Sequence, residues 1–144
     1  MTTGLEPEGE EMNLSNSPAA ASEHPRAAAS ASGFAVVWEE TGSGVMLALV
    51  DPSGGAGSSA TLLAPDPATH PVVAPDLLGG FAVAYQTSDG VELVRVNAAG
   101  VPQGEPLVFA GGSSPEIASI PEGGLVLGYF HAGAVRLARV GCTP

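Results

Sequence analysis

The chain has 144 residues and a net charge of −11, and its four basic residues are all arginines. Nucleic-acid binding and attraction to an anionic membrane both need a basic surface, so this charge balance excludes them. No stretch approaches the roughly 18 apolar residues that a membrane helix needs, so we also expect no membrane insertion.

The chain begins with a polar, acidic stretch, MTTGLEPEGEE, which lacks the apolar region of a signal peptide. We assign residues 1–23 to an N-terminal segment. Within it, residues 4–15 match residues 100–110, because both contain a glycine, an apolar residue and Pro-x-Gly-Glu, followed by a short stretch with apolar residues. This match predicts a lone strand at about residues 9–15.

Residues 18–32 are rich in alanine, but they contain Pro18 and Pro25 and lack the amphipathic period of a helix. We expect a loop that leads into the first strand.

Three similar repeats make up the rest of the chain, each opened by an X-Pro pair: His24-Pro25, His70-Pro71 and Ser114-Pro115. The pairs recur roughly every 45 residues, a period typical of repeat architectures. We assign residues 24–69, 70–113 and 114–144 to the three repeats.

Each repeat predicts short strands joined by glycine-rich turns, which in the second repeat lie at about 71–75, 80–87, 90–97 and 104–110. The third of these strands has apolar residues on both faces, as in a sheet that is covered on both sides. The third repeat ends before its fourth strand.

Four strands at this period predict an all-β fold of the β-propeller type, built from three four-stranded blades. An unpaired strand edge invites association, so we expect the N-terminal strand of the same or a second chain to complete the last blade. Natural propellers have roughly 4–8 blades, so three cannot close a ring. The expected partner is a second copy, in a homodimer or higher oligomer that exchanges terminal strands, or the remainder of a longer propeller.

The repeat pattern resembles the β-propeller-type repeats of bacterial surface and secreted proteins. The resemblance covers residues 24–141 and lies in Gly-Gly-Phe-x-Val-x-(Trp/Tyr), Asp-Gly-Val and Val-x-x-x-Gly. It implies an extracellular, periplasmic or cell-surface location, although this chain contains no signal peptide. The expected exchange of strands is similar to that of propeller lectins assembled from short chains, which implies a glycan as an alternative to a protein ligand.

Trp38, Tyr85 and Tyr129 occupy the same position in the three repeats. Aromatic rings repeated in this way can each stack on a sugar, or they can pack as wedges between blades. We favour packing, because other large apolar residues continue the same face of the strand. A role in ligand binding stays as the alternative.

Arg26 and Glu116 share one column of the repeats, on the strands predicted to be innermost, and are the other candidate ligand-binding residues. We interpret them as an ordinary charge pair. Propeller glycosidases work with paired carboxyl groups, whereas only Glu116 is expected at the channel. We therefore predict no catalytic residue.

His24 and His70 also share a column, and we expect them to be turn residues, because a metal site needs three or four convergent ligands. His131 is expected at the surface. The sequence predicts neither a metal nor another cofactor.

Two further pairs of charged residues follow from the repeat alignment. Glu92 and Arg136 are expected to form a surface ion pair. Arg95 and Arg139 are expected to line blade interfaces with their apolar stems and to keep their charged ends in water.

Cys142 is the single cysteine, so it cannot form a disulfide within the chain. It can link two chains in an oxidising compartment, or stay an idle thiol in the cytosol.

Taken together, the residues predict a non-catalytic binding or scaffold module. The alternatives are a glycan-binding propeller and a fragment of a propeller-type glycoside hydrolase.

Overall fold

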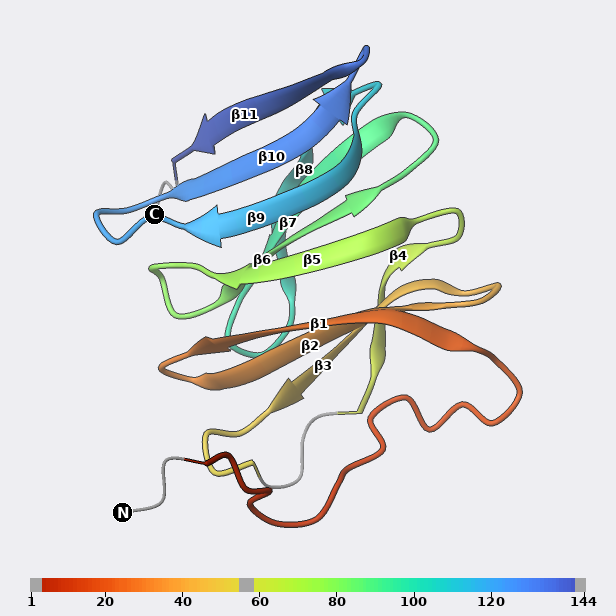
Figure 1. Cartoon of the computed structure of the whole chain (residues 1–144), viewed down its shortest axis with the longest axis vertical. Coiled ribbons are helices and arrows are strands. Elements are labelled where there is room, and N and C mark those ends of the chain that lie inside the picture. The colour runs from red at the N-terminus through yellow and green to blue at the C-terminus, as the bar shows by residue number, and fades with distance from the viewer. Residues whose placement is uncertain (1–3, 55–58, 142–144) are drawn as a thin grey trace.

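The structure is a computed structural model that describes residues 4–54 and 59–141, so Cys142 lies outside the described residues. Its regular elements are strands, which form three antiparallel sheets that follow one another along the chain (Figure 1). The all-β prediction is confirmed. Within the described ranges no helix is long and apolar enough to cross a membrane.

Consecutive strands are hydrogen-bonded neighbours in every sheet. The first sheet contains β1 (Ser22–Ser30), β2 (Gly33–Glu40), β3 (Gly44–Val50) and β4 (Thr61–Pro65). The second contains β5 (Thr69–Pro75), β6 (Phe81–Gln86), β7 (Gly90–Val96) and β8 (Pro102–Ala110). The third contains β9 (Ser113–Ser119), β10 (Leu125–His131) and β11 (Ala134–Val140), with β11 at its edge.

Of two expectations for the N-terminal part of the chain, one is wrong and the other stays a prediction. The alanine-rich stretch is mostly strand β1 and not a loop, because it finds a hydrogen-bonding partner in β2. The strand expected at residues 9–15 is not formed in the single chain, where the described residues 4–21 contain no strand, and it stays a prediction for the assembled state. They run past the first sheet, at the opposite end of the molecule from the third (Figure 1). A strand needs a ladder partner for its backbone groups, and this segment has none here.

The core consists of two apolar clusters, one between each pair of neighbouring sheets. We call the face of each sheet that carries Trp38, Tyr85 or Tyr129 its front face, and the opposite face its back face. The front face of the second sheet packs on the back face of the first through Phe81, Val83 and Tyr85, against Val37 and Leu47 among others.

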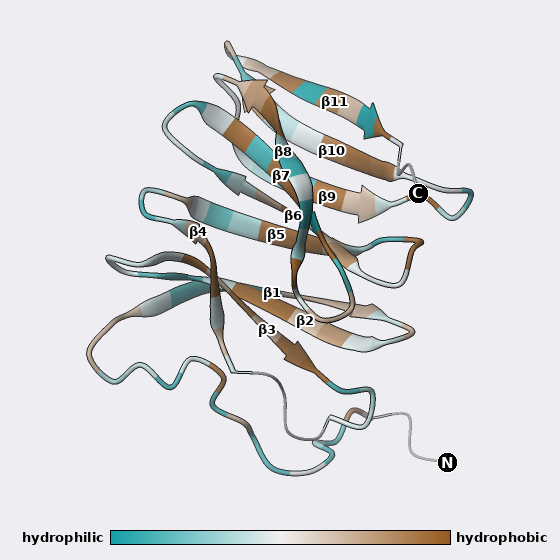
Figure 2. Ribbon diagram, turned by 180° about the vertical axis from the view of Figure 1, so that it is seen from behind, coloured by the Kyte–Doolittle hydropathy of each residue, from teal (hydrophilic) through white to brown (hydrophobic). Residues whose placement is uncertain are grey.

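The front face of the third sheet packs on the back face of the second in the same way, with Leu125 and Leu127 against Ala82, Ala84 and Leu93. The middle sheet therefore has two buried faces, as the apolar pattern of residues 91–97 predicts. In Figure 2 strand β3, whose back-face residues pack against the second sheet, is almost uniformly hydrophobic.

The turn between β6 and β7 requires glycine. Gly90 has a φ of +146°, and a Cβ atom built there would lie 2.2 Å from the carbonyl oxygen of Phe109 in β8. Gly44 is its counterpart in the first sheet, with a φ of +119° and a Cβ position 2.2 Å from the carbonyl oxygen of Ala64. Both residues let the last strand of their sheet approach the turn closely.

Candidate functional site

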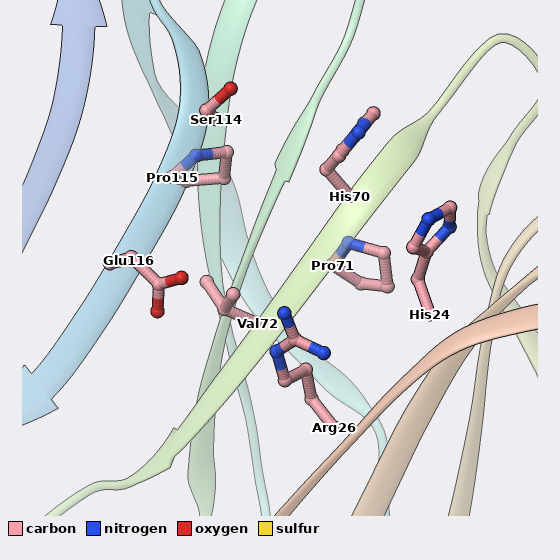
Figure 3. A pocket seen from close by; sticks show the side chains of 8 residues that line it. All are labelled: His24, Arg26, His70, Pro71, Val72, Ser114, Pro115 and Glu116. Atoms are coloured by element: carbon pink, nitrogen blue, oxygen red, sulfur yellow. The ribbon is translucent and has the colours of Figure 1, made fainter.

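The first strands of the three sheets lie beside one another, and a small pocket opens where they begin (Figure 3). Its volume is about 80 Å³. The lining residues are His24, Arg26, His70, Pro71, Val72, Ser114, Pro115 and Glu116. The structure thus brings Arg26 and Glu116 into one pocket, as their shared column predicts.

The X-Pro pairs form bulges inside strands, and the expectation that His24 and His70 are turn residues is wrong. His24, His70 and Ser114 have φ values of 52°, 52° and 49°. The pairing register of β1 and β5 shifts at these positions. A residue other than glycine is uncommon at positive φ, so three equivalent cases mark a conformation that the repeat imposes.

A hydrogen bond between neighbouring sheets begins at each of the last two bulges. The side chain of Glu39, in β2, accepts a bond of 3.0 Å from the backbone N–H of His70. The side chain of Gln86, the equivalent residue in β6, accepts one of 3.0 Å from the N–H of Ser114. We call residues 39, 86 and 130 the acceptor positions, and the third of them is Phe130, which cannot accept a hydrogen bond.

Glu39 also joins a small polar cluster. His24 Nδ1 lies 2.6 Å from Glu39 Oε2, and the rings of His24 and His70 are stacked with their centroids 5.3 Å apart. A metal would need more ligands than this cluster offers. Among the described residues there is no group of three or more His, Cys, Asp or Glu side chains placed to hold a metal ion.

Arg26 and Glu116 do not form the expected charge pair. Their side chains lie on either side of Val72 (Figure 3), and Arg26 Nη1 donates a hydrogen bond of 3.1 Å to the carbonyl oxygen of Pro25. Arg95 pairs instead with Asp76, and His24 lies against Glu39. The pocket therefore presents one cationic and one anionic group that face solvent separately.

The three aromatic residues lie on front faces, where sheets meet. Tyr85 is 4 % exposed between the first and second sheets. Tyr129 packs between the second and third sheets, with its ring centroid 5.3 Å from that of Phe109. Trp38 is 4 % exposed on the front face of the first sheet, where Met12 and Leu14 of the N-terminal segment line the same pocket. The Tyr85 ring therefore offers no open face to a sugar.

A buried ion pair that the sequence did not predict lies at the turn between β5 and β6. Asp76, with a side chain 0 % exposed, accepts a bond of 2.9 Å from Arg95 Nε. Its other carboxylate oxygen accepts bonds from the N–H groups of Leu78 and Gly80, at 2.9 and 2.8 Å. The expectation that Arg95 keeps its charged end in water is thus wrong, because its guanidinium reaches the carboxylate that holds this turn.

Two other expectations about polar residues are also wrong. Glu92 does not pair with Arg136 in the described structure, because the two residues lie on the front faces of different sheets, and Glu92 accepts a hydrogen bond of 3.0 Å from the Tyr85 hydroxyl. His131 is half-buried, and its Nδ1 atom is buried without a hydrogen-bond partner in the described structure. A Cβ atom at Gly111 would lie 3.0 Å from His131 Cε1, so the imidazole packs against that glycine.

Replacing Glu39 with alanine is expected to lower the free energy of unfolding by about 1 kcal/mol, because the His70 N–H loses its acceptor. Glu39→Gln is the matched control, since Gln86 already serves as an acceptor in the second sheet. Urea denaturation of both variants measures the effect. If the glutamine variant loses as much stability as the alanine variant, the hydrogen bond at this position does not contribute.

No described residues cover the back face of the third sheet as the following sheets cover the other two back faces. Val135 and Leu137 in β11 are 75 % and 76 % exposed, and Phe130 beside them is also exposed. Val45 and Leu47, their counterparts in the first sheet, are buried, as are Val91 and Leu93 in the second. The difference follows from position, because a following sheet covers the first two back faces but not the third.

Comparisons with known proteins bear on the fold alone. No protein-family model matches the sequence, and no curated protein matches it. The structure is similar to a solved GH43 glycoside hydrolase, a five-bladed propeller whose active site was engineered to give both endo-xylanase and exo-arabinofuranosidase activity. The two share 12 % identity and a TM-score of 0.52, over 83 % of this chain and 26 % of that one. The chain thus spans about a quarter of its neighbour's length, and the likeness supports a β-propeller-like fold.

Proposed function

We propose that this chain is a non-catalytic scaffold module, which becomes a complete propeller when further blades join it. The observation that carries the proposal is the exposed back face of the third sheet. Its residues occupy positions that are buried in the other two sheets. Burying exposed apolar surface of this kind favours association.

The unpaired edge of the same sheet supports the proposal. Among the described strands, β11 has a neighbour on one side only, whereas β3 and β7, its counterparts, are paired on both sides. An open edge presents free N–H and C=O groups to another strand. The exposed face and the open edge adjoin, so one partner can cover both.

We expect the purified chain to be a dimer at micromolar concentration, with six blades and the mass of two chains in light scattering. Leu137→Asp, on the exposed back face, is expected to yield the monomer, because it places a charge where a partner packs. Leu77→Asp is the matched control: Leu77 is also exposed but lies in the turn between β5 and β6. A monomeric mass for the unaltered chain contradicts the proposal.

A glycan-binding module is the second candidate, and the pocket of Figure 3 favours it. Arg26 and Glu116 present opposite charges there beside two histidines, and such groups can bind sugar hydroxyls. A glycan array tests this candidate, with Arg26→Ala as the variant that should lose any signal.

A glycoside hydrolase is a weaker candidate. The GH43 neighbour hydrolyses glycosides, and such reactions use two carboxyl groups about 5–10 Å apart. Among the residues that line the pocket, Glu116 is the one with a carboxyl group. Turnover of aryl xylosides or arabinofuranosides, lost in Glu116→Gln, would contradict the non-catalytic proposal.

A further inference from the structure

The second sheet shows which kind of strand would pair with the open edge of β11, because β7 is the counterpart of β11 and is paired with β8. Val135, Leu137 and Arg139 of β11 correspond to Val91, Leu93 and Arg95 of β7. In the second sheet these three residues pair with Phe109, Leu107 and Gln103 of β8. A strand that pairs with β11 should therefore resemble β8.

Residues 4–15 of the N-terminal segment have this resemblance, in backbone as well as in sequence. Gly9 aligns with Gly104 of β8, and both have positive φ, at +87° and +78°. Met12 and Leu14 then align with Leu107 and Phe109. The segment has the turn glycine and the alternating apolar residues of a β8 strand, but it lacks a neighbour to pair with.

The segment cannot reach β11 of its own chain in this structure. It runs beyond the first sheet, whereas β11 is the far edge of the third, and the second sheet lies between them (Figure 1). A second copy of the chain can bring the two together, and adding a strand to an open edge is a common mode of recognition. A propeller of two such chains would have two identical contacts of this kind.

We propose that residues 4–15 of one copy form the fourth strand of the third sheet of another copy, antiparallel to β11. The proposal rests on the proposed scaffold function and specifies its partner and contact surface. In the register of β7 and β8, Leu14 lies opposite Val135, Met12 opposite Leu137, and Glu8 opposite Arg139.

This register is chemically complementary. The two β11 residues that are three-quarters exposed in the single chain gain apolar partners. The segment carries Glu6, Glu8, Glu10 and Glu11, whereas β11 carries two of the four basic residues of the chain. Figure 2 shows two hydrophilic bands along the otherwise hydrophobic strand β11. Opposite charges and apolar pairs across neighbouring strands both stabilise a sheet.

Relative to the first sheet of its own chain, the segment lies in the place that β8 takes relative to the third sheet. Phe109 of β8, in the second sheet, packs against Tyr129 on the front face of the third sheet. Leu14, which aligns with Phe109, lines one pocket with Trp38, which aligns with Tyr129. The third sheet of a second copy can therefore be covered by the front face of the first sheet while it pairs with the segment.

A disulfide between the two proposed neighbours tests the register. The variant Met12→Cys with Leu137→Cys, made with Cys142→Ser so that no other thiol is present, should form a covalent dimer on mild oxidation. Directly opposite residues of a strand pair have the Cα separation that a disulfide needs. Met12→Cys with Arg136→Cys is the matched control and should not link, because Arg136 is also exposed but points to the other face.

A charge exchange gives a second measurement that needs no oxidation. Glu8→Arg and Arg139→Glu should each weaken the dimer about two- to fivefold in sedimentation experiments, and the double variant should restore it. A dimer that neither forms the Met12–Leu137 link nor responds to these charges overturns the strand pairing and leaves the scaffold function standing. A chain that is monomeric at all concentrations overturns both. Linking of the control pair in place of the test pair overturns the register.

Discussion

Asp76→Ala is expected to lower the free energy of unfolding by about 3–5 kcal/mol, which for a small domain is a large share of the total. The Asp76 carboxylate has no exposed surface, and it accepts hydrogen bonds from Arg95 and from two backbone N–H groups. Removing it leaves the guanidinium without its counter-ion and the β5–β6 turn without its main acceptor.

Two companion variants separate the ion pair from the turn. Asp76→Asn keeps an acceptor for the turn but loses the charge, so we expect a smaller loss of about 1–3 kcal/mol. Adding Arg95→Met to Asp76→Ala should recover part of the loss, because it removes the unpaired charge. Urea denaturation measures all three variants. A loss below about 0.5 kcal/mol for Asp76→Ala would mean that this ion pair is not structural.

Tyr85→Ala is expected to cost about 3–5 kcal/mol, because the ring fills the space between the first and second sheets. Tyr85→Phe keeps the ring and removes only the bond to Glu92, for an expected loss of about 1 kcal/mol. Urea denaturation followed by circular dichroism compares the two. A Tyr85→Ala protein of unchanged stability that has lost glycan binding would assign the ring to a ligand site.

The same residue predicts a pH dependence that Tyr85→Phe should abolish. Burial, together with the hydrogen bond to Glu92 and its negative charge, raises the pKa of the Tyr85 hydroxyl above its ordinary value of 10.0. The folded state therefore holds the Tyr85 proton more tightly than the unfolded chain does. The stability that the protonated hydroxyl contributes is fully present below pH 10. It is lost as the pH rises above 10, which denaturation curves at pH 9 and pH 11 should show for the unaltered chain.

The sequence predicted the all-β fold because the signals for strands and turns are short-range within each repeat. The alternating residues of 81–85 and the glycines of the tight turns are short-range signals, and they specified both faces of the middle sheet. β1 was misread because short alanines give no visible alternation. Its strand forms through pairing with β2, which is information held in the neighbour.

Residues of the candidate pocket could be predicted from the sequence only where they occupy the same position in different repeats. That logic placed Arg26 and Glu116 on one pocket, but it could not show that their side chains stay apart. Glu39 and Gln86 also share a column, and their role was missed because the group they bind is a backbone N–H. Asp76 and Arg95 have no equivalent pair in the other repeats, so repetition gave no signal for them.

The phenylalanine at the third acceptor position bears on how the number of blades could change by gene duplication. Suppose that a second copy of residues 70–113 were inserted after the first. Its bulge N–H would bond to Gln86 of the preceding blade, and its own Gln86 would accept a bond from the bulge N–H of the following blade. The hydrogen bond from a bulge N–H to an acceptor position would be kept at each junction between these blades. A blade appended after β11 would instead present its bulge N–H to the ring of Phe130. The middle of this chain is thus the place where the repeat can be multiplied at the least cost in polar contacts.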